Sequence, residues 1–377
     1  MSKKLCYFIN SAWYFELHWL DRAKAAIDAG HDVSLVARFN NTEILRKLES
    51  IGIKCFESNM KENGINPFIY LCDYLRVSKI LNKINPDILH CITIKPGIIS
   101  CLWCNINKKR LIYSFVGLGR VFENTSLVYK TLRFFITRLY SFLFSGIDCK
   151  VVFEHEADRN KIINIIGIEQ SKTVVIDGAG IDVNYFSYSE EPNEGIPKVL
   201  FASRMLWSKG LADLLKVKKR LTAEGINFEV LVAGIIVDND SDAINLHQIE
   251  KWDQSGDITW LGTRNDIKEL IQRSNIVALP SVYAEGVPRI LLEAGAVGRA
   301  TITYNIGGCN SLVKDGFNGA IVEKKNIVQF AEKLKTLLID NKLRSEMGLN
   351  ARKLVESKYS SDIIITETLR LYSIDNQ

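Results

Sequence analysis

The fold of this chain is decided by residues 199–233, VLFASRMLWSKGLADLLKVKKRLTAEGINFEVLVA. Two short apolar runs, 199–202 and 229–233, flank a longer amphipathic segment at 209–224. Short apolar runs on either side of an amphipathic helix predict a strand, a helix and a second, parallel strand. The stretch therefore predicts a βαβ unit and, with it, a parallel sheet covered by helices.

The same alternation extends in both directions through the 377 residues. Further strands are expected near 5–9, 33–37, 88–92, 111–116, 151–153, 174–176, 258–261, 277–280 and 301–304. Further helices are expected near 14–29, 42–50, 67–84, 97–105, 125–145, 156–166, 241–254, 265–273, 288–298, 326–338, 342–357 and 360–373. The spacing is typical of an α/β protein with repeated βαβ units.

The length fits about two domains, and a polar segment with Gly and Pro at 178–196 is typical of a linker. We therefore predict two Rossmann-like parallel-sheet domains that face a central cleft. The N-terminal domain covers 1–187, the C-terminal domain 188–359, and residues 360–377 form a last helix that can pack back on the N-terminal domain. Ligands of such sheets sit at the carboxyl ends of the strands.

Composition excludes an integral membrane protein. The first residues, MSKK, do not resemble a signal peptide, and the longest run without Asp, Glu, Lys or Arg, 300–313, is too short to span a bilayer. Eight scattered cysteines are typical of reduced thiols in a cytosolic protein. The net charge is +5, and residues 101–150 alone hold eight basic and two acidic residues. This patch can meet an anionic membrane surface or a phosphorylated substrate; no motif for nucleic acid accompanies it.

The strongest local signal is EGVPRILLE, which follows the strand predicted at 277–280. Gly286 permits a tight turn, and the backbone N–H groups that follow it, from Val287 on, would form an anion site at a helix N-terminus. Glu285 lies in the loop and Glu293 within the helix, so their carboxylates can accept hydroxyl hydrogen bonds from different sugars of one extended ligand. Alternatively, Glu285 caps the helix and Glu293 is an ordinary surface residue.

Two cations flank the turn after the strand at 199–202. Arg204 is expected at the end of that strand and Lys209 at the opening of the next helix. Together with a helix N-terminus, they can clamp a phosphate or diphosphate without a metal. An exposed basic turn is the alternative, but the pair of acids in the same half favours a binding site.

With these acids and cations, the chain resembles the GT-B-fold retaining glycosyltransferases of family 4, whose mark is an E-x7-E motif with an upstream Arg and Lys. The first half is similar to the bacterial capsule and O-antigen branch, through TIKPG at 93–97, FVGLG at 115–119 with Phe122, and GAGID at 178–182 with Phe186. The segment 204–210, with Trp207, is similar to enzymes that add an N-acetylhexosamine to a polyprenyl-diphosphate sugar.

The resemblance implies a role for each of the motif residues. Arg204 and Lys209 would bind the donor diphosphate, and Glu285 would contact the donor sugar near its reacting end. Glu293 would hold the ribose hydroxyls. Gly286 and Val287 would belong to the same donor loop, whose composition does not identify the sugar.

Candidates for acceptor binding lie in the first half. Lys95 follows an apolar strand, where it can meet a phosphate of a lipid-linked acceptor or remain a solvated loop lysine. His18, on the first helix, can contact donor or acceptor, although a lone histidine beside a strand is more often structural. Gly117 belongs to the FVGLG match. Many relatives carry a Gly-Gly pair after the first strand, whereas this chain has NSAWY at 10–14.

No metal or other cofactor is expected. The D-x-D matches within 238–242 fall in a polar loop, where Asp commonly caps a helix, and Arg204 and Lys209 can neutralise a diphosphate. The stretch 127–144, LVYKTLRFFITRLYSFLF, predicts a helix that belongs mostly to the core and offers one basic, aromatic edge to a membrane.

The resulting hypothesis is a retaining glycosyltransferase that moves an N-acetylhexosamine or hexose from a UDP-sugar to a lipid-linked saccharide, in capsule or O-antigen synthesis. Such an enzyme would work in the cytoplasm, peripherally associated with the inner face of the plasma membrane. Alternatives are a sugar-nucleotide epimerase and a transferase acting on a soluble acceptor. A dehydrogenase would require G-x-G-x-x-G after a first strand, which neither half supplies.

Overall fold

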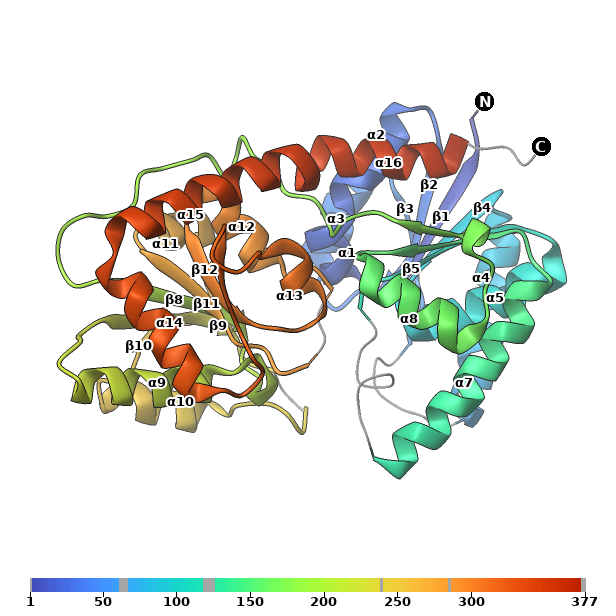
Figure 1. The fold of residues 1–377 in the computed structure, drawn as a ribbon. Helices are drawn as coiled ribbons and strands as arrows, with labels where there is room; N and C mark the ends of the chain where they lie inside the picture. Colours follow the sequence, from blue (N-terminus) through green and yellow to red (C-terminus); the bar gives the residue numbers. More distant parts are fainter. Residues whose placement is uncertain (1, 61–66, 118–125, 238–239, 284–285, 374–377) are drawn as a thin grey trace. The chain divides into compact units, whose positions relative to one another are not determined.

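A computed structural model describes the chain except for residues 1, 61–66, 118–125, 238–239, 284–285 and 374–377. The chain forms two compact units. One contains Met1–Ala179 together with Asp362–Gln377, and the other contains Gly180–Ser361. Each unit is a parallel sheet with helices on both faces (Figure 1).

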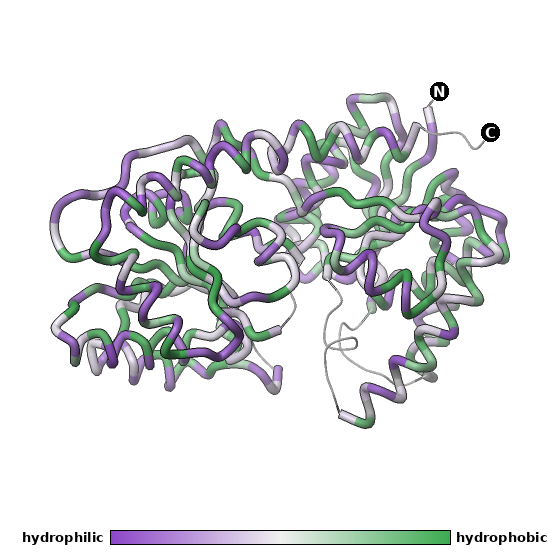
Figure 2. The backbone as a smooth tube through the Cα atoms, viewed as in Figure 1, coloured by the Kyte–Doolittle hydropathy of each residue, from purple (hydrophilic) through white to green (hydrophobic). Residues whose placement is uncertain are grey.

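The N-terminal unit is built on seven parallel strands in the order β3-β2-β1-β4-β5-β6-β7. Their bounds are β1 Lys4–Ser11, β2 Asp32–Arg38, β3 Lys54–Glu57, β4 Ile88–Ile92, β5 Arg110–Phe115, β6 Cys149–Phe153 and β7 Thr173–Val175. The central strands are buried at almost every position because both faces of the sheet are covered. Figure 2 shows these strands as hydrophobic segments inside more polar helices.

Helices cover both faces of this sheet. Four pack with one face into a single hydrophobic cluster: α4 Pro67–Ile84, α5 Ile94–Asn107, α7 Leu127–Ser145 and α8 Glu156–Ile166. The other face carries α1 Ala12–His18, α2 Leu20–Asp28, α3 Thr42–Ser50 and the C-terminal helix α16 Ser361–Ser373. Sheet edge β3, absent from the sequence prediction, is only half-buried.

A buried polar network holds α16 on the N-terminal sheet. The hydroxyl of Tyr372 lies 2.8 Å from both the hydroxyl of Tyr7 and Nδ1 of His90. The other ring nitrogen of His90 lies 2.8 Å from Oγ of Ser114. Burial lowers the pKa of His90 to about 3, and the nearby Arg22 contributes to the shift. The helix is therefore attached by hydrogen bonds to a neutral imidazole as well as by apolar contacts.

The C-terminal unit is built on six parallel strands in the order β10-β9-β8-β11-β12-β13. Their bounds are β8 Lys198–Arg204, β9 Glu229–Ile235, β10 Thr259–Trp260, β11 Ile276–Leu279, β12 Ala300–Tyr304 and β13 Gly319–Val322. The helices are α9 Leu211–Ala223, α10 Leu246–Gln254, α11 Ile267–Gln272, α12 Arg289–Val297, α13 Gly307–Leu312, α14 Ile327–Ile339 and α15 Asn341–Leu354. Helix α9 packs against α14, whereas α12 packs against α11 and α15.

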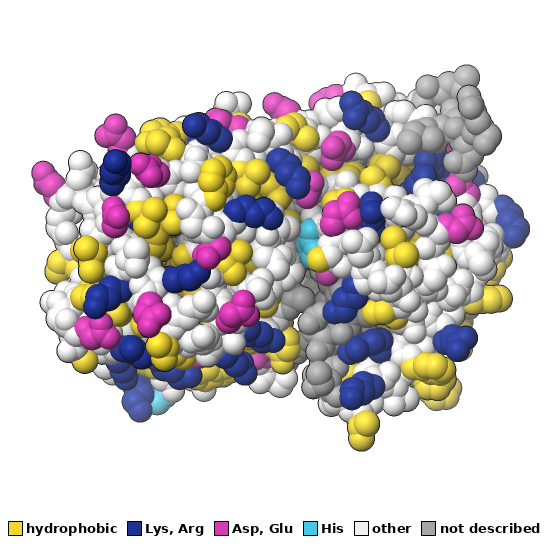
Figure 3. Space-filling view, in the orientation of Figure 1, with side chains coloured by type: hydrophobic (Ala, Val, Ile, Leu, Met, Phe, Trp, Pro, Cys, Tyr) yellow, Lys and Arg dark blue, Asp and Glu magenta, His cyan; other side chains and the backbone are white. Residues whose placement is uncertain are grey.

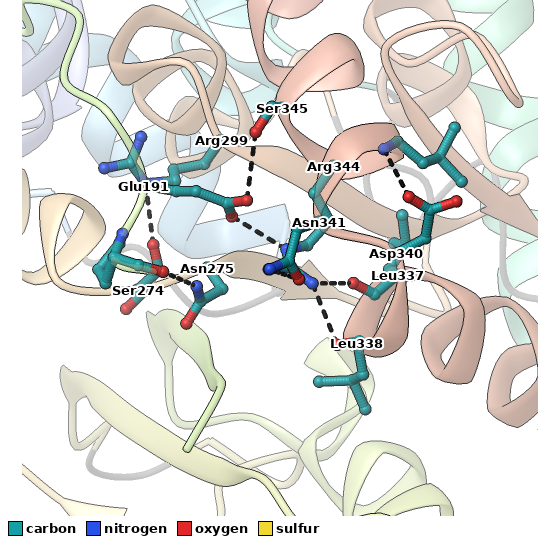
Figure 4. Close-up of polar contacts among 12 residues, drawn as sticks. Glu191, Ser274, Asn275, Arg299, Leu337, Leu338, Asp340, Asn341, Arg344 and Ser345 are labelled. Atoms are coloured by element: carbon teal, nitrogen blue, oxygen red, sulfur yellow. Dashed lines mark hydrogen bonds and ion pairs between the residues drawn. The ribbon is translucent and has the colours of Figure 1, made fainter. Parts of the chain in front are cut away.

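Two buried arginines fasten the segment that leads into this sheet (Figure 4). Arg299 is 1% exposed and donates hydrogen bonds to the carbonyl oxygens of Ser189, Glu190 and Ser274, among others. Arg344 binds Oε2 of Glu191 at 2.9 Å and also the carbonyls at the end of α14. Burial lowers the pKa of Arg299 to about 10. These guanidinium groups satisfy backbone acceptors that would otherwise be buried without partners.

Candidate active site

The chain order of the C-terminal strands defines where a ligand binds. Strands β8, β9 and β10 build the sheet in one direction, and the chain then returns to place β11 on the other side of β8. The carboxyl ends of β8 and β11 therefore form the switch point of this sheet, which is the usual ligand position in doubly wound sheets.

The predicted cations lie at this switch point. Arg204 is the last residue of β8, and its side chain is exposed. The guanidinium group makes no hydrogen bond or ion pair within the described part of the chain. Lys209 is half-buried at the end of the 3₁₀ helix η2 (Trp207–Lys209). Gly210 follows with φ 85° and leads into α9. A Cβ atom on Gly210 would lie 2.0 Å from the carbonyl oxygen of Pro280, so only glycine allows the two loops to approach this closely.

Hydrogen bonds join the loops after β8, β9 and β11. The N–H of Val282 donates to the carbonyl of Ser208 at 2.7 Å, and Oγ of Ser281 donates to the same carbonyl at 3.3 Å. The carboxylate of Asp242 accepts hydrogen bonds from the N–H and the hydroxyl of Ser208. Asp240 in turn accepts from the N–H of Asp242. Both acids are thus engaged in holding the loop between Arg204 and Lys209, and no group of three potential metal ligands occurs among the described residues.

The segment after β11 leads into α12, which carries the buried acid Glu293. Glu285 lies outside the described residues, so its predicted roles stay predictions. Gly286 and Val287 precede α12, and a Cβ atom on Gly308 would lie 2.0 Å from the carbonyl oxygen of Gly286. This loop is therefore packed directly against the start of α13.

Glu293 is only 7% exposed, which excludes the alternative of an ordinary surface residue. Its Oε1 accepts a hydrogen bond from Nε of Arg289, one helical turn earlier, at 2.8 Å. Burial raises the pKa of Glu293, and the charge and hydrogen bond of Arg289 act in the opposite direction. A carboxylate held in this way can accept hydrogen bonds from ligand hydroxyls.

Lys95 does not lie in the predicted loop. Helix α5 begins at Ile94, three residues earlier than predicted, so Lys95 lies in its first turn and is 5% exposed. Its Nζ is 2.7 Å from Oδ2 of the buried Asp73 and 4.9 Å from the ring centroid of Tyr70. The alternative of a solvated loop lysine is therefore wrong. Binding of an acceptor phosphate by Lys95 stays a prediction, and the phosphate would have to compete with Asp73 for the ammonium group.

The other two acceptor candidates also lie in the N-terminal unit. His18 is the last residue of α1, half-buried, with its ring centroid 4.3 Å from that of Tyr14. Gly117 follows β5 at φ 106°, a conformation that favours glycine. Their contacts with substrates stay predictions.

Several site residues were missed by sequence reasoning. Arg289 forms an ion pair with Glu293. The i, i+4 spacing of the two residues is visible in the sequence and could have indicated this pair. The contact of Ser208 with Asp242 joins residues 34 positions apart, and no local pattern indicates it. The close approaches of Gly210 to Pro280 and of Gly308 to Gly286 likewise cannot be predicted from the sequence, because they join separate loops of the folded chain.

Two doubly wound parallel sheets, with cations and a buried acid at a strand switch point, are the architecture typical of α/β nucleotide-binding proteins. Comparison with known families makes this specific. Residues 4–153 match the model described as "Glycosyl transferase 4-like", and residues 186–354 match "Glycosyl transferases group 1". The chain belongs to this family of glycosyltransferases, which confirms the predicted enzyme class.

Individual relatives agree with this assignment. The chain is 29% identical over 345 residues to the N,N'-diacetylbacillosaminyl-diphospho-undecaprenol alpha-1,3-N-acetylgalactosaminyltransferase of Campylobacter jejuni, covering 88% of each chain. It is 26% identical over 301 residues to the UDP-Gal:alpha-D-GlcNAc-diphosphoundecaprenol alpha-1,3-galactosyltransferase of Escherichia coli, covering 75% of this chain and 74% of the relative.

A solved structure establishes the fold. Anabaena Alr3699/HepE, crystallised with UDP and glucose, superposes with a TM-score of 0.78 over 99% of this chain and 100% of its own, at 19% identity. The predicted GT-B fold of two Rossmann-like domains is confirmed.

Proposed function

We propose that this glycosyltransferase moves an N-acetylhexosamine or hexose from a UDP-sugar to a polyprenyl-diphosphate-linked saccharide, with retention of configuration, in the synthesis of a surface polysaccharide such as capsule or O-antigen. The observation that carries the proposal is Arg204, an exposed guanidinium without a partner in the described chain, at the switch point of the C-terminal sheet. The names of the two relatives above, both of which act on diphospho-undecaprenol saccharides, support the acceptor class.

The charges of the C-terminal unit suit departure of a nucleoside diphosphate. When the bond between the sugar's anomeric carbon and the β-phosphate oxygen breaks, negative charge gathers on that oxygen. Arg204 and Lys209 would stabilise this charge without a metal, and the stabilisation is greatest in the transition state. Glu293 would accept hydrogen bonds from the ribose hydroxyls. The acceptor hydroxyl would attack from the leaving-group face and give its proton to the departing phosphate, and Glu285 is proposed to contact the donor sugar.

We further propose that α7 brings the enzyme to the cytoplasmic face of a membrane. Its outer side exposes Leu127, Phe134, Phe135 and Phe142, with Phe142 75% exposed, next to the cation Arg138. Figure 3 shows basic and hydrophobic side chains intermixed over this part of the N-terminal unit. Apolar rings beside cations match an anionic headgroup layer. No helix of the described chain is long and apolar enough to span a bilayer.

The test of the chemistry is transfer of radiolabelled sugar from a panel of UDP-sugars to short-chain polyprenyl-diphosphate saccharides. We expect label in the organic phase, and label that remains in the aqueous phase would refute the lipid-linked acceptor. Arg204→Ala and Lys209→Ala should each raise the donor KM or lower kcat by roughly ten- to a hundredfold, because each removes a charge-assisted hydrogen bond. Lys353→Ala, which removes an exposed charge elsewhere in the same unit, is the control.

The membrane proposal has a separate test. Co-sedimentation with vesicles that contain anionic lipid should fall strongly in the double variant Phe135→Ser and Phe142→Ser, while transfer to a short-chain acceptor in detergent stays unchanged. Equal sedimentation of the variant and the wild type would contradict the role of α7.

A further inference from the structure

The N-terminal sheet has its own switch point, between β1 and β4. Strands β1, β2 and β3 extend the sheet in one direction, and β4 begins the other. Phe8 of β1 pairs with Cys91 of β4, and two residues beyond this pair come Asn10 and Thr93. Both residues thus lie at the carboxyl ends of two paired strands, the usual place of a ligand in this kind of sheet.

Both residues hold a polar atom that the described chain leaves without a partner. Oδ1 of Asn10 and Oγ1 of Thr93 are shielded from solvent, and neither makes a hydrogen bond. A buried polar atom without a partner costs about 1–3 kcal/mol, so such atoms are rare in folded proteins. Two of them at the carboxyl ends of the two strands that form a switch point indicate groups that are satisfied by a ligand.

The backbone at Thr93 also departs from what the sequence favours. Thr93 has φ 75° and ψ 167°, a conformation that β-branched residues rarely adopt. The conformation is not explained by helix capping, since the Thr93 side chain makes no capping hydrogen bond to α5.

The chemistry of the two atoms selects the ligand. A carbonyl oxygen only accepts hydrogen bonds, whereas a threonine hydroxyl both donates and accepts. A sugar hydroxyl can donate to Asn10 and accept from Thr93, but an ionised phosphate offers no donor to Asn10. The nearest predicted phosphate ligand, Lys95, is already paired with Asp73. Trp13, on the first turn after β1, adds a ring that is 38% exposed, and aromatic rings pack on the apolar faces of pyranoses.

From this arrangement we infer that Asn10 and Thr93, with Trp13 beside them, bind a sugar ring of the acceptor through its hydroxyls, separately from the acceptor diphosphate. The inference rests on the proposed function, which supplies the saccharide acceptor. It also gives a role to the segment 10–14, NSAWY, which follows β1.

The test compares Thr93→Val, which removes the hydroxyl but keeps the β-branched shape, with Thr93→Ser, which keeps the hydroxyl. Thr93→Val and Asn10→Ala should each raise the acceptor KM about three- to tenfold, the worth of one neutral hydrogen bond, while the donor KM stays unchanged. Thr93→Ser should remain near the wild type. The melting temperature of Thr93→Val without substrates should equal or exceed that of the wild type, because an unpartnered hydroxyl is removed.

Two competitors separate the sugar from the phosphate. Methyl glycosides of N-acetylglucosamine and N-acetylgalactosamine should inhibit the wild type more than Thr93→Val, whereas sugar-free short-chain prenyl diphosphate should inhibit both equally. An unchanged acceptor KM in Thr93→Val and Asn10→Ala, or weaker inhibition of Thr93→Val by the sugar-free diphosphate, would overturn the inference.

Failure of the proposed function would look different. In that case the wild type would transfer no label from any UDP-sugar. Saturation-transfer NMR with the methyl glycosides, on the wild type and on Thr93→Val, would still show whether this site binds a sugar. Equal saturation transfer in both proteins would reject it.

Discussion

Replacement of Gly210 by alanine tests how the C-terminal site is assembled. Gly210 lies between Lys209 and α9 at φ 85°, and its Cα approaches the end of β11 so closely that an added Cβ would lie 2.0 Å from the carbonyl oxygen of Pro280. Gly225, at the other end of α9, has a similar φ of 80° but no atom within 4 Å of an added Cβ. The pair Gly210→Ala and Gly225→Ala therefore separates steric overlap from backbone strain.

The expected cost follows from these contacts. At either glycine, alanine in a left-handed conformation costs about 1–2 kcal/mol. At Gly210 the carbonyl of Pro280 must also retreat, by about 1.4 Å to reach an ordinary contact of 3.4 Å. This movement breaks the hydrogen bonds that Ser281 and Val282 make to Ser208, each worth about 1 kcal/mol. We expect Gly210→Ala to lose about 2 kcal/mol more than Gly225→Ala.

Guanidinium denaturation and scanning calorimetry measure this difference, which corresponds to roughly 4–8 °C for a unit of this size. The donor KM should rise in Gly210→Ala and not in Gly225→Ala, because only the first displaces Lys209 from its position. Equal losses of stability in the two variants would refute the steric argument and leave backbone strain as the sole effect.

Three further changes probe ionisable side chains that are buried or partly buried. Arg289→Met removes the group that lowers the pKa of Glu293, so the pKa of Glu293 should rise. The acid limb of the pH profile of kcat/KM for the donor should then move to higher pH, and Arg289→Lys should return that limb toward its wild-type position. The pKa of His90 is about 3 in the fold and near 6.5 in the unfolded chain, so only the unfolded chain binds a proton at this residue between these pH values. The free energy of unfolding should therefore fall as the pH drops below about 6.5. Urea denaturation at pH 7 and pH 5 should show a smaller fall for His90→Gln than for the wild type. Arg299→Lys offers three donors where the guanidinium makes six hydrogen bonds, and chemical denaturation should show a loss of about 2–4 kcal/mol.

The sheets were predictable where strands are central and buried on both faces. The run at 199–202 lies within β8 and that at 88–92 coincides with β4, because such strands are apolar at nearly every position. The edge strands β3 and β13 were missed. Strand β3 has the sequence KCFE, with charged residues at both ends, and β13 begins at Gly319, so neither gives a continuous apolar run.

Helix boundaries failed where tertiary contacts override the local pattern. The single helix predicted at 14–29 is broken at Trp19, which has φ −124° and is buried against the sheet. The helix predicted at 97–105 begins at Ile94, directly after Thr93, whose positive φ no local propensity indicates. For the site, motif spacing located Arg204 and Glu293, whereas the burial of Glu293 and the pairing of Lys95 with Asp73 depend on segments far apart in sequence.

The switch point between β8 and β11 and the switch point between β1 and β4 differ in charge. This difference bears on how similar sheets can bind the proposed donor diphosphate and the proposed acceptor sugar. The C-terminal one presents Arg204 with no acid paired to it within the described residues, which suits a ligand that arrives with negative charge. At the N-terminal one, the cation Lys95 is paired with buried Asp73, and the atoms without partners, on Asn10 and Thr93, are neutral. A diphosphate gains more from the first and a sugar hydroxyl more from the second, because desolvating a charge is costly unless an opposite charge receives it. The topology supplies equivalent positions in both units, and the side chains placed there decide which part of each substrate is bound.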